Sequence, residues 1–241
     1  MKNLFLVVFA FASLQVFAQQ SKVITDANAK PRAINESFNA ISVSDGIQLY
    51  ITQGNETSLA VSVSDEKYAE KFKTEVVDGV LKIYYDNNGV NWNLNIKRKL
   101  KAYLSFKTIE KLTASGGADV IAATPLNVDK LEMKFSSGSL FTGKLKSNEL
   151  DIKQNSGAEI KLEGSTIKLK VDVSSGAALK GYDFSTDYCD AKATSGGSVK
   201  ISINKELSAK ANSGGDIHYR GSASVTDINI NSGGSVKKER I

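Results

Sequence analysis

A short turn sequence recurs seven times in the second half of the chain. Each copy places Ser, Thr or Asn close before a glycine, and successive glycines are separated by 21, 19, 19, 20, 18 and 19 residues. The aligned glycines are Gly117, Gly138, Gly157, Gly176, Gly196, Gly214 and Gly233. A fixed period of this length is the signature of a stacked repeat architecture. The repeat therefore constrains the fold more closely than it constrains the function.

Apolar residues stand at alternate positions on both sides of each turn. Counted from the residue before the aligned glycine, the fourth position upstream holds Leu112, Met133, Ile152, Val171, Ala191, Ala209 and Ile228. The fourth position downstream holds Val120, Phe141, Ile160, Leu179, Val199, Ile217 and Val236. Charged or polar residues lie between these positions, and a period of two predicts half-buried strands.

Each repeat therefore reads as a strand, a tight turn, a second strand and a second turn. One such unit cannot bury its apolar face alone, whereas copies stacked about 4.8 Å apart share one continuous core. We expect an all-β fold, a right-handed parallel β-helix or β-solenoid, because crossovers between parallel strands are right-handed. An antiparallel sandwich is the alternative, although its hairpins need no recurrent turn at the period of a full repeat.

The N-terminus has the pattern of a secretory signal. Lys2 supplies the charge, Leu4–Phe11 an apolar run, and Val16-Phe17-Ala18 a cleavage site. The apolar run is too short to cross a membrane, and no later segment approaches about 20 apolar residues. We expect the chain to be exported through this signal, with a periplasmic, cell-surface or secreted destination.

The expected organisation is one domain with short flanking segments. The segments are a signal peptide at 1–18, a linker at 19–37, a single β-helix domain at 38–236 and a charged tail at 237–241. Within the domain, 38–106 are expected to form irregular rungs or a cap, and 107–236 the regular repeats. One helix is indicated in the first part, because Tyr68, Phe72 and Val76 recur at four-residue steps after a possible N-cap at Ser64 or Asp65.

Charge and cysteine content exclude several classes of function. Removal of Lys2 with the signal leaves 30 basic and 26 acidic residues, far from the basic excess of a nucleic-acid-binding domain. The single cysteine, Cys189, excludes an intrachain disulfide framework. We expect it to be a small buried hydrophobe.

Charged residues also recur at the repeat period. One acidic column and one lysine column fall on the same face, where they are expected to form exposed ion pairs: Glu132, Asp151, Asp190 and Asp227 with Lys134, Lys153, Lys192 and Lys210. A third column, the basic stripe, has no equally regular acidic neighbour and consists of Lys161, Lys180, Lys200, His218 and Lys237. The basic stripe is the candidate ligand-facing surface, for an anionic polymer or glycan. A merely solvated face is the alternative.

Catalytic chemistry is not indicated. Polysaccharide hydrolysis needs two carboxylates about 5–9.5 Å apart. The turn-adjacent acids Asp119, Glu159 and Asp216 fall two and three repeats apart, hence about 10 Å and 14 Å. His218, the one histidine, shares its column with lysines, and no calcium-type repeat, phosphate loop or nucleophile elbow is present. We therefore predict no catalytic residues, no cofactor and no metal site.

The order of several motifs resembles that of a known family. The motifs are Phe38-x-x-Ile41-x-Val43-x-x-Gly46, Gln53-Gly54, Asp65–Glu70, Val77–Ile83 and serial turns, best matched at Gly117–Val120 and Ser213–Ile217. Over about residues 38–236 they resemble the autotransporter adhesin head GIN domain family of Bacteroidetes-type bacteria. The resemblance implies a β-helix shaped like pectin lyases or hexapeptide acyltransferases without their catalytic residues, and a role in adhesion. Some repeats lack the acid of the family's turn and carry instead Ser139, Ala178, Ser198 and Ser235.

The leading hypothesis is a non-enzymatic, adhesin-like binding domain that contacts a surface glycan or another polymer through a repetitive face. A regular array of side chains suits weak, multivalent contacts. The competing hypothesis is a periplasmic structural or assembly protein without a ligand. A polysaccharide lyase or hydrolase is a third, weaker hypothesis.

Overall fold

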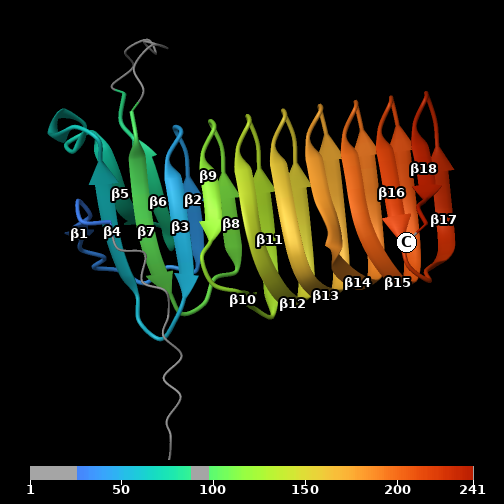
Figure 1. Cartoon of the computed structure of the whole chain (residues 1–241), viewed down its shortest axis with the longest axis horizontal. Coiled ribbons are helices and arrows are strands. Elements are labelled where there is room, and N and C mark those ends of the chain that lie inside the picture. The colour runs from blue at the N-terminus through green and yellow to red at the C-terminus, as the bar shows by residue number, and fades with distance from the viewer. Residues whose placement is uncertain (1–25, 88–97, 241) are drawn as a thin grey trace, which may run out of the picture.

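The computed structural model describes residues 26–87 and 98–240; the expected signal at 1–18 lies outside them. The described residues form one elongated β-solenoid, whose rungs follow one another along the long axis of the molecule (Figure 1). Neighbouring rungs pair in parallel throughout the regular repeats. The predicted all-β solenoid is therefore confirmed.

The long strands of the regular part each contribute to two successive arms of the coil. The strands in chain order are β1 (Lys30–Arg32), β2 (Ala40–Val43), β3 (Gln48–Gln53), β4 (Ser58–Val63), β5 (Phe72–Val77), β6 (Val80–Tyr85), β7 (Leu100–Phe106), β8 (Lys111–Ala114), β9 (Asp119–Ala122), β10 (Leu126–Asn127), β11 (Lys130–Phe135), β12 (Leu140–Gln154), β13 (Glu159–Ser174), β14 (Ala178–Thr194), β15 (Ser198–Asn212), β16 (Asp216–Arg220), β17 (Ser224–Ile230) and β18 (Ser235–Lys238).

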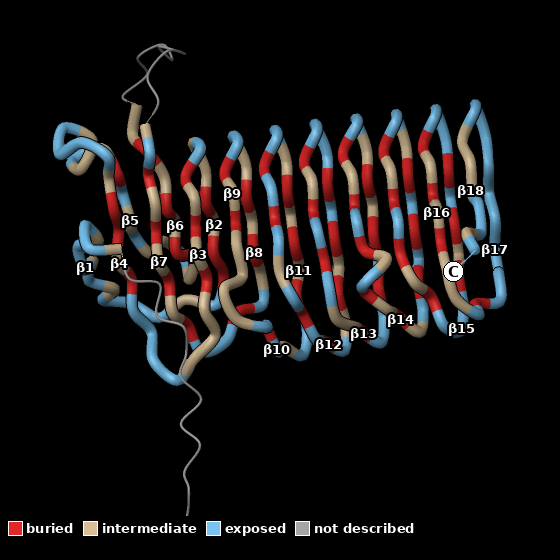
Figure 2. The backbone as a smooth tube through the Cα atoms, viewed as in Figure 1, coloured by how far each residue is buried: buried red, intermediate tan, exposed pale blue. Residues whose placement is uncertain are grey.

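Each regular rung has two arms that face one another across the core. The arms that precede the tight turns form the pre-turn sheet, for example 149–154, and the arms that follow them form the post-turn sheet, for example 159–163. Their inner side chains meet: the rings of Phe135 and Phe141 pack edge to face, with 5.9 Å between centroids. Buried and exposed positions alternate along both arms, as period two requires (Figure 2).

The tight turns stack into one row along the solenoid. In one turn, Ser137 and Gly138 both adopt left-handed backbone angles (φ 53° and 71°), and the Ser139 N–H donates to the Ser136 carbonyl over 3.1 Å. Two successive left-handed residues define a type I′ turn, which explains the recurrent glycine. The Gly138 N–H then donates to the carbonyl of Ser156 in the next turn over 3.0 Å, so that each turn supports its neighbour.

The row of turns begins before the periodic region. Asp45 and Gly46 adopt the same left-handed angles, and the Gly46 N–H donates to the carbonyl of Gly116 over 2.9 Å. The sequence period did not include this turn, because β4, β5 and β6 separate it from the regular series.

The N-terminal end is closed by antiparallel strands. β2 and β3 pair in parallel with β8 and β9 of the first regular rung, whereas β4 runs antiparallel to β7 and β1 antiparallel to β4. β1 lies inside the segment that was expected to be a linker. It carries Pro31, which cannot donate to a further strand and therefore suits an edge.

The predicted helix at Tyr68–Val76 is wrong. Only Glu66–Tyr68 form a short 3₁₀ turn, capped by the Asp65 carboxylate, which accepts from the Lys67 N–H over 3.2 Å. Phe72 begins β5, which forms an antiparallel hairpin with β6 through Asp78-Gly79. The hairpin buries Phe72, whose spacing fits a helix and a strand equally well.

The C-terminal end is open. The columns of Ile228 and Ile230 are buried in the earlier rungs, but these two residues are 47% and 46% accessible, because none of the strands in 26–87 and 98–240 packs over the outer side of β17. The neighbouring β18 ends at Lys238, within the charged sequence Lys237-Lys238-Glu239-Arg240, and charge at an open edge opposes further strand addition.

Candidate functional site

The structure brings the residues of the basic stripe together on the post-turn sheet. Lys161 is paired in register with Lys180, and Lys180 with Lys200. The same column continues from Lys200 to His218 and from His218 to Lys237. Five basic or titratable side chains therefore stand on consecutive rungs, about 4.8 Å apart along the axis.

The stripe is less basic than its sequence indicates. The Glu159 carboxylate lies 2.7 Å from Lys180 Nζ and 3.2 Å from Lys161 Nζ, and these partners hold its pKa below the usual value. His218 Nδ1 lies 2.6 Å from Glu239 Oε1. Three of the five stripe residues therefore have an acidic partner, but these partners, Glu159 and Glu239, do not form a column of their own at the repeat period. Lys200 and Lys237 make no ion pair within the described residues.

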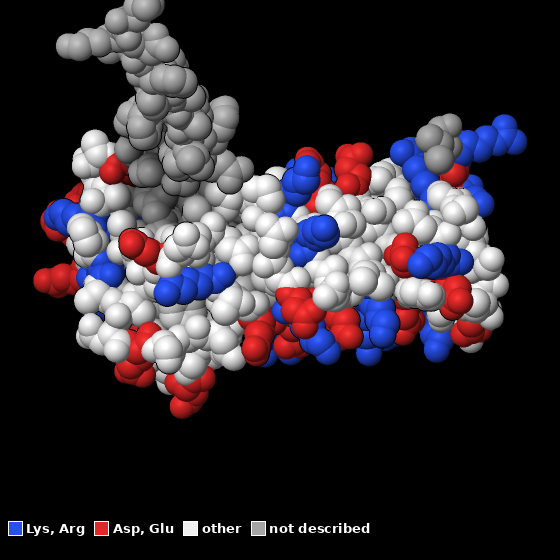
Figure 3. All heavy atoms as spheres, turned by 90° about the horizontal axis from the view of Figure 1, so that it is seen from below, with Lys and Arg blue, Asp and Glu red and all other residues white. Residues whose placement is uncertain are grey.

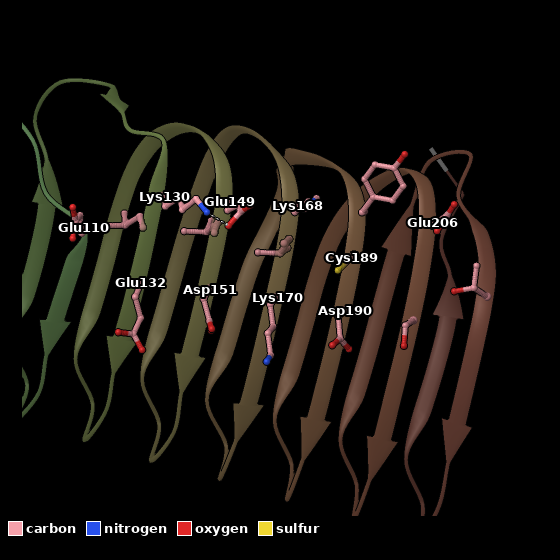
Figure 4. Close-up of a pocket in the computed structure, with 16 residues that line it drawn as sticks. Glu110, Lys130, Glu132, Glu149, Asp151, Lys168, Lys170, Cys189, Asp190 and Glu206 are labelled. Atoms are coloured by element: carbon pink, nitrogen blue, oxygen red, sulfur yellow. Dashed lines mark ion pairs between the residues drawn. The ribbon is translucent and has the colours of Figure 1, made fainter.

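Sequence reasoning missed a groove on the pre-turn sheet. An open groove of about 660 Å³ runs along the axis, from Glu110 at one end to Thr226 at the other. Its floor is the strand backbone at Leu131, Leu150, Leu169 and Cys189, whose side chains are buried in the core beneath it. In Figure 4 the labelled charged side chains stand in two rows on either side of this floor.

The two walls of the groove are columns in register. One wall is formed by Lys130, Glu149, Lys168, Tyr188 and Glu206, and the other by Glu132, Asp151, Lys170, Asp190 and Ser208. Corresponding wall residues are two positions apart on each strand, which separates their Cα atoms by about 7 Å. The groove is therefore narrow across the strands and long along the axis.

In the half of the groove nearer the N-terminus, the acidic side chains already form ion pairs with lysines. Glu132 lies 2.6 Å from Lys134 Nζ, 3.4 Å from Lys111 Nζ and 3.7 Å from Lys153 Nζ, and its pKa is lowered, chiefly by the hydrogen bond from Lys134. Lys130 and Glu149 form a further ion pair of 3.0 Å. The predicted pairing of the acidic and lysine columns is confirmed for Glu132 and Asp151 with Lys134 and Lys153. It is wrong further along, because Lys192 pairs with Asp172 instead of a member of the acidic column.

The half nearer the C-terminus keeps its charges unpaired. Lys168, Lys170, Asp190 and Glu206 make no ion pair with any described residue. Tyr188 stands among them with 38% of its surface exposed, and Lys205 Nζ lies 5.5 Å from its ring centroid. This half therefore presents free donors, free acceptors and an exposed ring.

The geometry gives little support to hydrolysis. The register places Asp119, Glu159 and Asp216 two and three rungs apart, as predicted. Leu140, rather than Ser139, shares their column. A general acid needs a raised pKa, whereas each described carboxyl with a resolved pKa shift is lowered: Asp26, Asp65, Glu132, Glu159, Asp187 and Glu239.

The described residues also give little indication of a metal site, a reactive thiol or a membrane-spanning helix. These residues contain no cluster of three or more His, Cys, Asp or Glu side chains suited to a metal ion. Cys189 is buried as predicted, and burial raises the pKa of its thiol to about 12. None of the helices in 26–87 and 98–240 has the length and hydropathy of a membrane crossing.

Acidic and basic side chains are interspersed along one long margin of the solenoid (Figure 3).

The pattern of turns, rungs and capped N-terminal end matches a described family. The family "Putative auto-transporter adhesin, head GIN domain" matches residues 37–223. The chain belongs to this head GIN domain family. The resemblance seen in the sequence is thereby confirmed. No curated protein is significantly similar to this head GIN domain chain.

Solved structures share the fold of this head GIN domain. A putative adhesin from Bacteroides fragilis superposes with a TM-score of 0.77 at 17% identity, covering 88% of this chain and 96% of its own. A putative adhesin from Parabacteroides distasonis gives 0.70 at 18%, covering 88% and 96%. A structure described as a putative lipid binding protein from the same species gives 0.59 at 19%, covering 89% and 98%. At these identities the likeness concerns the fold.

Proposed function

We propose that this chain is an exported, non-enzymatic, adhesin-like domain that binds a surface glycan or another surface polymer through a repetitive face of its solenoid. The observation that supports the proposal most directly is the in-register column of Lys161, Lys180 and Lys200. Like side chains at a constant spacing allow one polymer to make several weak contacts at once. Family membership and the signal-like N-terminus agree with this role.

Binding of the full chain to an array of neutral and anionic glycans tests the proposal. The array is probed with the unchanged protein and with the variant Lys161→Ser/Lys180→Ser/Lys200→Ser. A matched control replaces three lysines of the pre-turn sheet, Lys134, Lys153 and Lys192, by serine. If the basic stripe is the contact surface, the stripe variant should lose binding to anionic glycans, and the control variant should retain it.

A structural or assembly role without a ligand gives a different result. It predicts that no glycan or anionic polymer on the array binds the unchanged protein reproducibly. That outcome would remove the binding proposal.

A further inference from the structure

We propose that the C-terminal half of the pre-turn groove is a binding site for a single neutral, hydroxyl-rich glycan chain lying along the solenoid axis. This inference rests on the proposed function for the claim that a polymer is bound. It adds a second face, the groove of the pre-turn sheet, and the chemical class of the ligand that binds there.

The shape of the groove fits one extended chain. Its floor is continuous over successive rungs, since Leu150, Leu169 and Cys189 are register neighbours. The wall residues are two positions apart on each strand, so the Cα atoms of opposite walls are about 7 Å apart along the whole groove. A ligand that occupies such a groove must be long and thin.

The unpaired charges indicate a neutral ligand. In the C-terminal half, Lys168 and Lys170 contribute two positive charges, and Asp190 and Glu206 two negative charges. Lys170 is the register neighbour of Asp190, yet their side chains do not approach within ion-pair distance. A balanced set of this kind gives no net attraction to a polyanion or a polycation. Sugar hydroxyls both donate and accept hydrogen bonds, so they can satisfy carboxylates and ammonium groups together.

Tyr188 supplies the apolar contact. It lies on the wall between Lys168 and Glu206 in register, and 38% of its surface is exposed. A sugar ring has an apolar face, and an exposed aromatic ring beside hydrogen-bonding groups suits such a ligand. The N-terminal half of the groove does not offer the same combination, because Glu132 and Glu149 are already paired with lysines.

Isothermal titration of the full chain with uncharged hexasaccharides tests the site. The probes are cellohexaose, maltohexaose and mannohexaose, with a polyuronate hexamer as the anionic comparison. We expect at least one neutral hexamer to bind. Asp190→Asn should weaken its binding about tenfold, the loss typical of a charged hydrogen bond, and Tyr188→Ala should weaken it by several-fold through loss of the ring contact. Glu132→Gln, on the paired half of the same groove, is the matched control and is expected to leave binding unchanged.

The stripe variant separates this inference from the proposed function. The groove is supported as the binding site if Tyr188→Ala and Asp190→Asn lose binding to the neutral hexamers and Lys161→Ser/Lys180→Ser/Lys200→Ser retains it. Binding of the polyuronate alone, lost only in the stripe variant, overturns the groove and leaves the proposed function standing. Failure of every probe overturns the groove; polymer binding as such is then decided by the wider glycan array. If Tyr188→Ala lowers the unfolding temperature, Asp190→Asn, an exposed isosteric change, decides alone.

Discussion

Lys180 Nζ lies 2.7 Å from the carboxylate of Glu159 on the preceding rung. The same carboxylate also contacts Lys161, so one acid reduces the positive charge of two members of the basic stripe. The replacement Glu159→Gln should therefore strengthen binding of an anionic polymer about twofold, as expected for an exposed pair worth a few tenths of a kcal/mol. Titration at low and high salt measures this, because screening should remove the gain. Equal affinities for both proteins at low salt would contradict a role for the stripe.

The Glu132 network should make stability depend on pH. Its pKa is lowered in the folded chain, so its contribution is complete above about pH 4.5, the value for an unperturbed Glu, and is lost as pH falls through the folded pKa. Glu132→Gln should lower the free energy of unfolding by about 1 kcal/mol at pH 7 and by much less at pH 3. Urea unfolding at the two pH values measures the difference.

Glu206→Gln is the control for that experiment, because Glu206 makes no ion pair with the described residues. It should change stability by a similar, small amount at both pH values. A pH-independent loss in Glu132→Gln would mean that its ion pairs contribute nothing to folding.

The thiol of Cys189 should be inert in the folded protein. It is 5% exposed beneath the groove floor, and burial raises its pKa to about 12, so the reactive thiolate is scarce at neutral pH. A thiol reagent at pH 8 should label one cysteine per chain after unfolding in urea, and none on the same timescale before it. Rapid labelling of the native protein would show that this part of the groove floor opens.

The last rungs have glycine where earlier rungs carry alanine or serine. A Cβ at Gly215 would lie 2.1 Å from the carbonyl oxygen of Ala193, a backbone atom that cannot move aside. Gly215→Ala should destabilise the chain by about 2 kcal/mol or more. Gly54→Ala is the matched control, since its Cβ would meet only Ser105 Oγ at 3.4 Å. Equal unfolding free energies for the two variants would contradict this packing.

The regular rungs were predictable because their determinants are local and repeated. Each rung restates the same alternation and the same left-handed turn, so the register of Leu179 with Val199 follows from counting. The strand at Phe72 was not predictable in this way. Its spacing from Tyr68 and Val76 fits a helix, and the deciding signal was the Asp78-Gly79 turn that joins β5 to β6.

The candidate site was only partly accessible from the sequence. The basic stripe and the acidic column follow from the period, and Glu132 and Asp151 were placed on neighbouring rungs. Which charges pair was not accessible, because Glu132 lies within reach of lysines on three different rungs while Asp190 reaches no described lysine. The groove itself depends on how side chains leave the sheet, which spacing does not encode.

The dependence of affinity on the length of the oligosaccharide tests the central claim most directly, namely that one polymer lies along successive rungs. Titration of the full chain with one neutral and one anionic series, each from one to eight sugar units, should show for at least one series an affinity that rises with length. The affinity should level off when the occupied face is filled, since each added contact becomes intramolecular. A monosaccharide that binds as tightly as the longest member of its series, or the failure of both series to bind, would contradict the account.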